Sequence, residues 1–288
     1  MAISQTRRFG ILLVLVSAVM WSTAGLFVRM ADLDIWSVIG WRSLFSAVVL
    51  GGWLALRCRG GADAALHFGV PGVAATLIAT VAAISYIMSL TWTTVANVMT
   101  IYATLPFVAT LIAFIWFRER VSARFVIAGV VAFIGVCVMV GAAFSPRDLL
   151  GIVAAVVMTL CFALQLVISR RYPRLDTVLM LTLAAVFCLL VALPNMQLVI
   201  PPTKSLLACA LYGILSTGLG YTLVLIGGRI IGPGEAGFLS MLDVVLGPFW
   251  VWIFYGETIG PATFAGGGAV LLAVIWYLAG DSKPRRVE

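Results

Sequence analysis

Residues 10–30 read GILLVLVSAVMWSTAGLFVRM, and residues 151–171 read GIVAAVVMTLCFALQLVISRR. The two stretches align without a gap, so that Gly10 falls on Gly151 and Arg29 falls on Arg170. About 20 consecutive apolar residues are enough for a helix to cross the hydrocarbon core of a bilayer. Each stretch is therefore predicted to be a transmembrane helix, and their likeness indicates a chain built from two related halves.

The composition of the whole chain supports a membrane protein. Of its 288 residues, 63% are hydrophobic and 10% are charged, whereas a soluble domain has about 45–50% apolar and about 25% charged residues. The net charge of +7 comes from 18 dispersed basic residues, too thinly spread for a nucleic-acid interface. Five unclustered cysteines and a single histidine, His67, predict no disulfide framework, no metal site and no cofactor.

Ten apolar segments are long enough to span a bilayer, which predicts an all-α integral membrane protein. Short connections separate these segments. The first apolar segment is interpreted as a retained helix rather than a cleaved signal peptide. The expected spans are 10–30, 34–56, 67–90, 95–117, 124–144, 149–169, 176–199, 205–227, 233–255 and 259–279.

Basic residues predict the orientation, because cytoplasmic loops of membrane proteins are enriched in Lys and Arg. With the N-terminus in the cytoplasm, 14 of the 18 basic residues fall inside, three fall outside and Arg42 lies within a span. We therefore expect both termini to be cytoplasmic.

The likeness of the halves continues beyond the first span, since Glu119 matches Glu257 and Gly129 matches Gly267. The chain thus divides into residues 1–145 and 146–288, with five expected spans in each. An odd number of spans forces the second half to enter the membrane in the opposite sense. Such inverted repeats are typical of secondary transporters, in which the substrate site lies near the bilayer midplane between the halves.

Several of these residues resemble a known family. Trp21, Ser22 and Gly25 in the first span, Pro106 in the fourth, and Glu119 shortly after it resemble the EamA-type repeats of the drug/metabolite transporter superfamily. The resemblance implies a ten-helix metabolite transporter.

The second half keeps the acidic residue of this pattern but departs from it elsewhere. The family often has an acidic residue followed by proline, where this chain has Asp243–Val244 and a displaced Pro248. Within the superfamily, the stretch WSTAGLFVR resembles YddG-like aromatic amino-acid exporters. That resemblance implies export of Phe, Tyr, Trp and related solutes across a bacterial inner membrane.

Polar groups inside a bilayer are functional candidates because they are costly to bury there. Asp243 is expected to bind a substrate ammonium or carry a coupled proton, or else to bond a neighbouring helix end. Arg42 is expected either to attract a substrate carboxylate or to extend toward the membrane surface. Asn97 and Glu235, at matching places in spans four and nine, are interpreted as caps of helix starts, with substrate binding by Asn97 as the alternative.

Two prolines, two glutamates and several small residues are expected to shape the helices. Pro106 and Pro248 interrupt matching spans, which predicts either a hinge around a central pathway or a static kink. Glu119 and Glu257 are expected to be structural, and the small residues of spans five and ten predict a close-packed scaffold.

Deep aromatic and polar residues predict the lining of a central cavity, because rings with scattered hydroxyl and amide groups suit an amphipathic, ring-bearing substrate. The substrate-binding candidates beside Arg42, Asn97 and Asp243 are Trp21, Ser22, Tyr86, Tyr102, Phe162, Gln165, Tyr221 and Ser240.

The combined prediction is a secondary transporter that works by alternating access on aromatic amino acids. Its partners would be a small-molecule substrate and the lipid bilayer, with no nucleic acid, and a monomer is compatible with the sequence. The alternative is an exporter of cationic drugs or other small metabolites, with or without proton coupling. A membrane enzyme is disfavoured because the few intramembrane charges form no convergent catalytic set.

Overall fold

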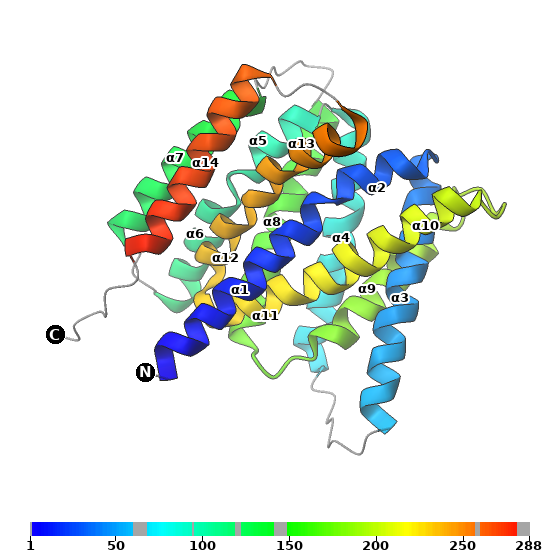
Figure 1. Cartoon of the computed structure of the whole chain (residues 1–288). Helices are drawn as coiled ribbons and strands as arrows, with labels where there is room; N and C mark the ends of the chain where they lie inside the picture. Colours follow the sequence, from blue (N-terminus) through cyan, green and yellow to red (C-terminus); the bar gives the residue numbers. More distant parts are fainter. Residues whose placement is uncertain are drawn as a thin grey trace.

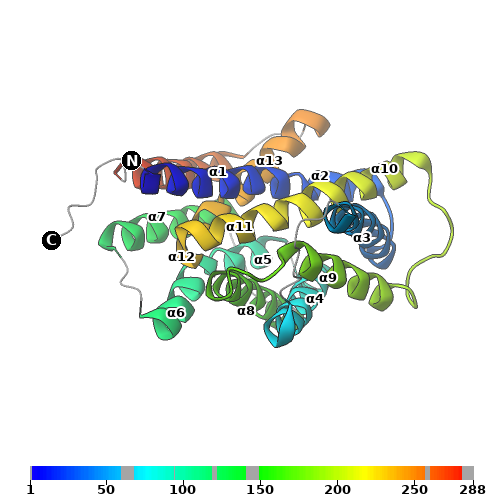
Figure 2. The ribbon, with the colours of Figure 1, turned by 90° about the horizontal axis from the view of Figure 1, so that it is seen from below.

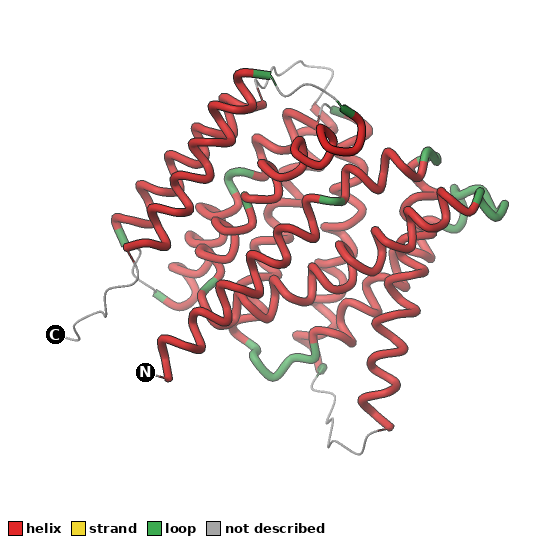
Figure 3. Tube along the Cα trace, viewed as in Figure 1, coloured by secondary structure: helices red, strands yellow, loops and turns green. Residues whose placement is uncertain are grey.

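A computed structural model describes residues 2–59, 68–93, 95–118, 122–140, 149–256 and 260–280. Within these ranges the chain is helical and contains no strand (Figures 1 and 3). His67, Glu119 and Glu257 lie outside the described residues.

The helices follow one another in two series. The first consists of α1 (Ala2–Ser22), α2 (Ala24–Ala31), α3 (Ile35–Arg59), α4 (Gly69–Trp92), α5 (Val95–Tyr102), α6 (Leu105–Phe117) and α7 (Ala123–Val140). The second consists of α8 (Leu149–Arg171), α9 (Thr177–Ala192), α10 (Thr203–Leu211), η2 (Tyr212–Gly220), α11 (Tyr221–Ile231), α12 (Pro233–Ser240), α13 (Leu242–Tyr255) and α14 (Pro261–Gly280).

Eight segments among the described residues are long and apolar enough to cross a membrane. Some of them are single helices, and others join consecutive helices. Two further apolar helices, Ala123–Val138 and Thr177–Ala192, are shorter. The eight segments are Gln5–Ala31, Ile35–Arg59, Gly69–Leu90, Asn97–Phe117, Leu149–Arg171, Thr203–Ile231, Pro233–Tyr255 and Pro261–Gly280. The chain is thus a multi-pass integral membrane protein by the length and composition of its helices.

The same capping interaction begins equivalent helices in the two series. Asp34 accepts hydrogen bonds from the backbone N–H groups of Trp36 and Ser37, in the first turn of α3, at 3.1 and 3.0 Å. Asp176 likewise accepts from the residues two and three positions later at the start of α9, both at 3.1 Å. An aspartate satisfies otherwise unpaired N–H groups at a helix start, and its recurrence supports the relation between the halves.

Matching interruptions also divide the fourth and ninth expected segments. One lies at Ala103–Thr104, between α5 and α6, and the other at Met241, between α12 and α13. The two prolines predicted to act as a hinge or a static kink lie after these interruptions and not at them. Pro106 is the second residue of α6, where its missing N–H would have no helical partner, and Pro248 lies inside α13.

The segment expected as one regular helix over 205–227 is also different. A π-helix, η2, separates α10 from α11. Three glycines, a tyrosine, a serine and a threonine lie within its sequence YGILSTGLG. Because glycine has no side chain, it allows the backbone of another helix to approach closely.

The helices surround a packed interior, with α7 and α14 paired at one edge (Figure 1). In Figure 2, α1, α2 and α13 lie along one side and α4, α6 and α8 along the other. A Cβ atom on Gly135 of α7 would lie 2.7 Å from the carbonyl oxygen of Gly266 in α14. The small residues of this pair therefore allow the close packing expected of a scaffold.

Candidate functional site

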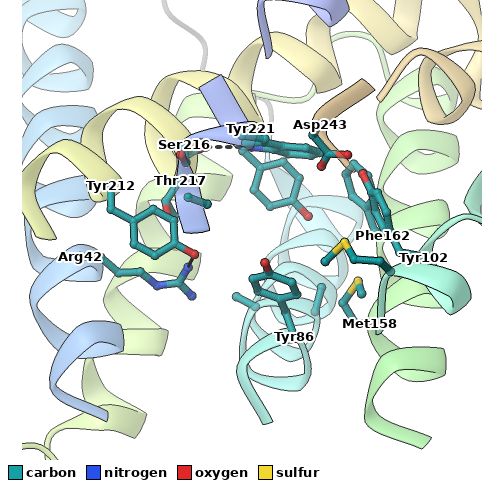
Figure 4. A pocket seen from close by; sticks show the side chains of 15 residues that line it. Arg42, Tyr86, Tyr102, Met158, Phe162, Tyr212, Ser216, Thr217, Tyr221 and Asp243 are labelled. Atoms are coloured by element: carbon teal, nitrogen blue, oxygen red, sulfur yellow. Dashed lines mark hydrogen bonds between the residues drawn. The ribbon is translucent and has the colours of Figure 1, made fainter. Parts of the chain in front are cut away.

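A cavity of about 160 Å³ lies between residues from both halves of the chain (Figure 4). Its lining is mostly apolar and includes six aromatic rings, one guanidinium and one carboxylate. The lining residues are Trp21, Ala24, Arg42, Ala82, Ala83, Tyr86, Met99, Tyr102, Met158, Phe162, Tyr212, Ser216, Thr217, Tyr221 and Asp243.

The structure brings together seven of the eleven residues proposed from sequence as substrate-binding. These are Trp21, Arg42, Tyr86, Tyr102, Phe162, Tyr221 and Asp243. The other four, Ser22, Asn97, Gln165 and Ser240, are buried but do not line the cavity.

Hydrogen bonds to other protein groups occupy the four polar side chains outside the lining. Ser22 Oγ donates to the Val19 carbonyl at 2.6 Å, and Ser240 Oγ donates to the carbonyl four residues earlier at 2.8 Å. Asn97 Nδ2 donates to Thr93 Oγ1 at 2.9 Å. Gln165 Nε2 donates to a backbone carbonyl of α4. Three of these side chains thus donate to helix carbonyls and the fourth donates to a neighbouring hydroxyl, as is common for polar side chains within helices.

Three rings form a compact wall on one side of the cavity. The centroid of Trp21 lies 5.1 Å from that of Phe162 and 5.6 Å from that of Tyr221, and Phe162 and Tyr221 are also 5.6 Å apart. Tyr102 stacks on Phe162 at 6.4 Å with an interplanar angle of 17°. Trp21 and Phe162 occupy equivalent positions of the two halves in the alignment above, so the equivalent first helices meet at this wall.

Arg42 occupies the opposite part of the cavity and is 5% exposed. Its Nη1 donates to the Tyr212 hydroxyl at 2.9 Å, and its Cζ lies 4.9 Å from the centroid of the Tyr212 ring. No described carboxylate forms an ion pair with Arg42, and its Nε has no hydrogen-bond partner among the described residues. The side chain is therefore held inside the protein against Tyr212, which favours the first expectation over an extension toward the membrane surface.

Asp243 lies in the first turn of α13, directly after the break at Met241. Its Oδ1 is buried and has no hydrogen-bond partner in the described part of the chain. Figure 4 shows its carboxylate across the cavity from Arg42, with the rings of Tyr86 and Tyr221 between them. The cavity thus places one guanidinium and one carboxyl group on either side of aromatic rings.

Sequence reasoning missed Tyr212 as a lining residue because the π-helix was not anticipated. Tyr212 and Tyr221 are nine residues apart, which is about two and a half turns of an α-helix and places them on opposite faces. A π-helix has hydrogen bonds from i to i+5 and a wider turn. Its presence brings Tyr212, Ser216, Thr217 and Tyr221 to the same cavity.

Glu235 has a contact that was not expected either. It lies in the first turn of α12, as a capping residue would, but its Oε1 accepts a hydrogen bond from Arg7 Nη2 at 2.6 Å. No group of three or more His, Cys, Asp or Glu side chains that could hold a metal occurs among the described residues.

A family model for EamA-like transporters matches residues 8–141 and matches a second time over residues 149–279. The chain belongs to the EamA-like transporter family. As a member of this EamA-like family the chain is a membrane transporter, and the two matches correspond to the two series of helices. No curated protein matches the sequence.

Solved structures also match this EamA-like chain. One crystal structure has a TM-score of 0.79 and 18% sequence identity, and the alignment covers 95% of this chain and 99% of that one. At this identity the likeness shows a shared fold over nearly the whole length of both chains.

Proposed function

We propose that this EamA-like protein is a secondary transporter of aromatic amino acids in a bacterial inner membrane. In this proposal ten spans form two inverted five-helix repeats, residues 1–145 and 146–288, with both termini in the cytoplasm. The start of α1 and the end of α14 lie toward the same side in Figure 1, which supports an even number of crossings. The observation that carries the substrate class is the separation of Arg42 from Asp243 by aromatic rings within one cavity.

The chemistry of the cavity complements a zwitterion that bears a ring. Arg42 supplies a planar guanidinium that suits a carboxylate, and Asp243 supplies an acceptor for an ammonium group. Trp21, Phe162 and Tyr221 offer ring faces and edges at 5.1–5.6 Å from one another, a spacing at which aromatic groups attract. A purely cationic drug would leave the guanidinium of Arg42 without a counter-ion.

An asymmetry between equivalent half-helices supports alternating access. In the repeat alignment, α5 corresponds to α12 and α6 corresponds to α13. All eight residues of α12 are buried, and α12 packs on α6, where a Cβ atom on Gly237 would lie 3.2 Å from Leu105 Cγ. The corresponding α5 begins at Val95, which is 59% exposed, and no comparable packing joins it to α13 among the described residues.

This difference has a simple consequence for a transporter with two related halves. If the halves exchange conformations, α5 and α13 would close while α6 and α12 separate, which would open the cavity to the other side. The chain would then expose one substrate site alternately to each face of the membrane.

Uptake into proteoliposomes tests the substrate class directly. Labelled Trp, Phe and Tyr are compared with Leu, Lys and a cationic dye, with and without a pH gradient. We expect saturable uptake of the three aromatic amino acids alone. Uptake of the dye, or of the amines that correspond to these amino acids with equal efficiency, would favour the cationic-drug alternative. A rate that responds to the pH gradient would indicate proton coupling, and an indifferent rate would indicate facilitated diffusion.

A further inference from the structure

The contact between Arg42 and Tyr212 fixes the guanidinium in two ways. The Tyr212 hydroxyl accepts from Nη1 at 2.9 Å, and its ring lies 4.9 Å from Cζ. An arginine side chain otherwise adopts many rotamers, so these two contacts hold one orientation among many. With Nη1 occupied, Nε is buried and has no hydrogen-bond partner among the described residues. Nε and Nη2 form the planar edge of a guanidinium that suits bidentate carboxylate binding.

The backbone also holds the two residues together. A Cβ atom on Gly213, the residue after Tyr212, would overlap the carbonyl oxygen of Arg42. The main chains of α3 and η2 therefore touch at the point where the side-chain contact forms. Only glycine allows this approach, so the sequence Tyr212–Gly213 places the tyrosine against Arg42.

The first helix anchors the π-helix from its other side. Trp21 Nε1 donates to the Ser216 carbonyl at 2.9 Å, and Ser216 Oγ donates to the Met20 carbonyl at 2.9 Å. Ser17 Oγ donates to the Gly220 carbonyl at 2.8 Å. Because Trp21 is also part of the aromatic wall, η2 connects the ring side of the cavity to the Arg42 side.

We propose that Tyr212, presented by the π-helix, positions Arg42 to bind the carboxylate of the substrate and thereby makes the cavity prefer amino acids over the corresponding amines. This inference rests on the proposed function and names a residue that acts through Arg42. Tyr212 is therefore a positioning residue, and its hydroxyl is the group that holds the Arg42 guanidinium.

The Tyr212→Phe variant tests the inference because it keeps the ring over the guanidinium and removes only the hydroxyl. We expect the KM for labelled phenylalanine to rise about tenfold, in line with the loss of a hydrogen bond to a charged group, while the KM for phenethylamine changes less than about twofold. Tyr255→Phe is the matched control: Tyr255 is exposed at the end of α13 and lies outside the cavity lining, so neither KM should change.

A double-mutant cycle separates positioning from a general structural effect. In an Arg42→Gln background, Tyr212→Phe should have no further effect on the phenylalanine KM. An equal rise in both KM values, or an undiminished effect of Tyr212→Phe without Arg42, would overturn the inference while the transport function stands.

Binding distinguishes failure of this inference from failure of the proposed function. If the wild type transports no aromatic amino acid, the proposed substrate class is wrong, and thermal stabilisation by phenylacetate and by phenethylamine is measured instead. A phenylacetate shift that Tyr212→Phe removes would still support a carboxylate site set by Tyr212. No phenylacetate shift, or one that the variant retains, would overturn it.

Discussion

Arg7 Nη2 donates to Glu235 Oε1 at 2.6 Å, and this ion pair joins α1 to the first turn of α12. The Glu235 side chain is 9% exposed and that of Arg7 is 32% exposed. Since the two residues come from different repeats, the pair links the halves beside the packed contact of α12 with α6. A Cβ atom on Gly234, which precedes Glu235, would overlap the hydroxyl of Thr110 in α6, so the ion pair lies at the closed side of the proposed pathway.

The first prediction is that Arg7→Gln loosens this side of the protein. Leaving the buried Glu235 carboxylate without Arg7 should cost about 1–3 kcal/mol in the closed conformation. Hydrogen–deuterium exchange of the α12 amides, residues 233–240, should become at least severalfold faster, because the conformation with α12 separated from α6 gains population.

Arg57→Gln is the control for this experiment. Arg57 also forms an ion pair, with Asp176 at 3.1 Å, but that pair joins α3 to the start of α9. Its removal should leave exchange in α12 unchanged. Equal acceleration by both variants would mean that Arg7 stabilises the fold in general rather than one closed side.

A second prediction concerns Asp243. We expect Asp243→Asn to raise the KM for ammonium-bearing substrates about tenfold, because a hydrogen bond to a carboxylate is about twice as strong as one to a neutral amide. The measurement is uptake of phenylalanine and phenethylamine at several pH values. Full transport by the variant at every pH would remove Asp243 from the mechanism.

Asp34→Asn provides a matched change outside the cavity. Asp34 accepts from backbone N–H groups at the start of α3, and asparagine caps a helix about as well as aspartate. This variant should transport as the wild type does. A loss as large as that of Asp243→Asn would point to an effect of net charge instead of a local interaction.

A third prediction tests the close approach of α3 and η2. Gly213→Ala should lower the free energy of unfolding by about 1–3 kcal/mol, the usual cost of overpacking a well-packed interior. Gly52 lies in α3, the helix that Gly213 contacts, and a Cβ atom added to Gly52 would have no other atom within 4 Å. Gly52→Ala should therefore be neutral or stabilising by up to about 1 kcal/mol. Thermal unfolding in one detergent compares the two variants. A smaller loss for Gly213→Ala than for Gly52→Ala would contradict the contact.

Depth within an apolar segment was enough to find much of the cavity but not all of it. Trp21, Tyr86 and Phe162 were selected because they lie deep in their segments, and all three line the cavity. Ser22 and Ser240 lie equally deep but donate to carbonyls three and four residues earlier. Depth gives no information on which face of a helix a hydroxyl occupies, and a nearby carbonyl competes for it.

Local helix geometry limited the remaining predictions. The repeat and the family pattern were visible in the sequence, and Pro106 and Pro248 were predicted to be a hinge or a static kink in matching segments. The break at Ala103–Thr104 instead precedes Pro106 by two residues, since proline is tolerated in a first turn. Tyr212 was missed for a related reason: regular helical periodicity cannot place it beside Tyr221, and no general sequence rule predicts the π-helix.

The fourth prediction separates the two prolines. Pro248 lies inside α13 and cannot donate to the carbonyl of Val244, four residues earlier, so it weakens the helix at that point. Pro248→Ala supplies the missing N–H, and we expect a stiffer α13, a higher melting temperature and a several-fold lower maximal uptake rate if bending of α13 accompanies transport.

Pro106→Ala gives the comparison that decides between a hinge and a static kink. At the second residue of α6 a backbone N–H would find no helical partner, so this variant should melt and transport nearly as the wild type does. The two variants share the same chemical change in matching segments and differ only in helical position. Slower transport by Pro106→Ala with unchanged transport by Pro248→Ala would place the moving point at the Ala103–Thr104 break instead of within α13. Unchanged transport by both would assign the prolines a packing role, because neither restored N–H would then affect the conformational change.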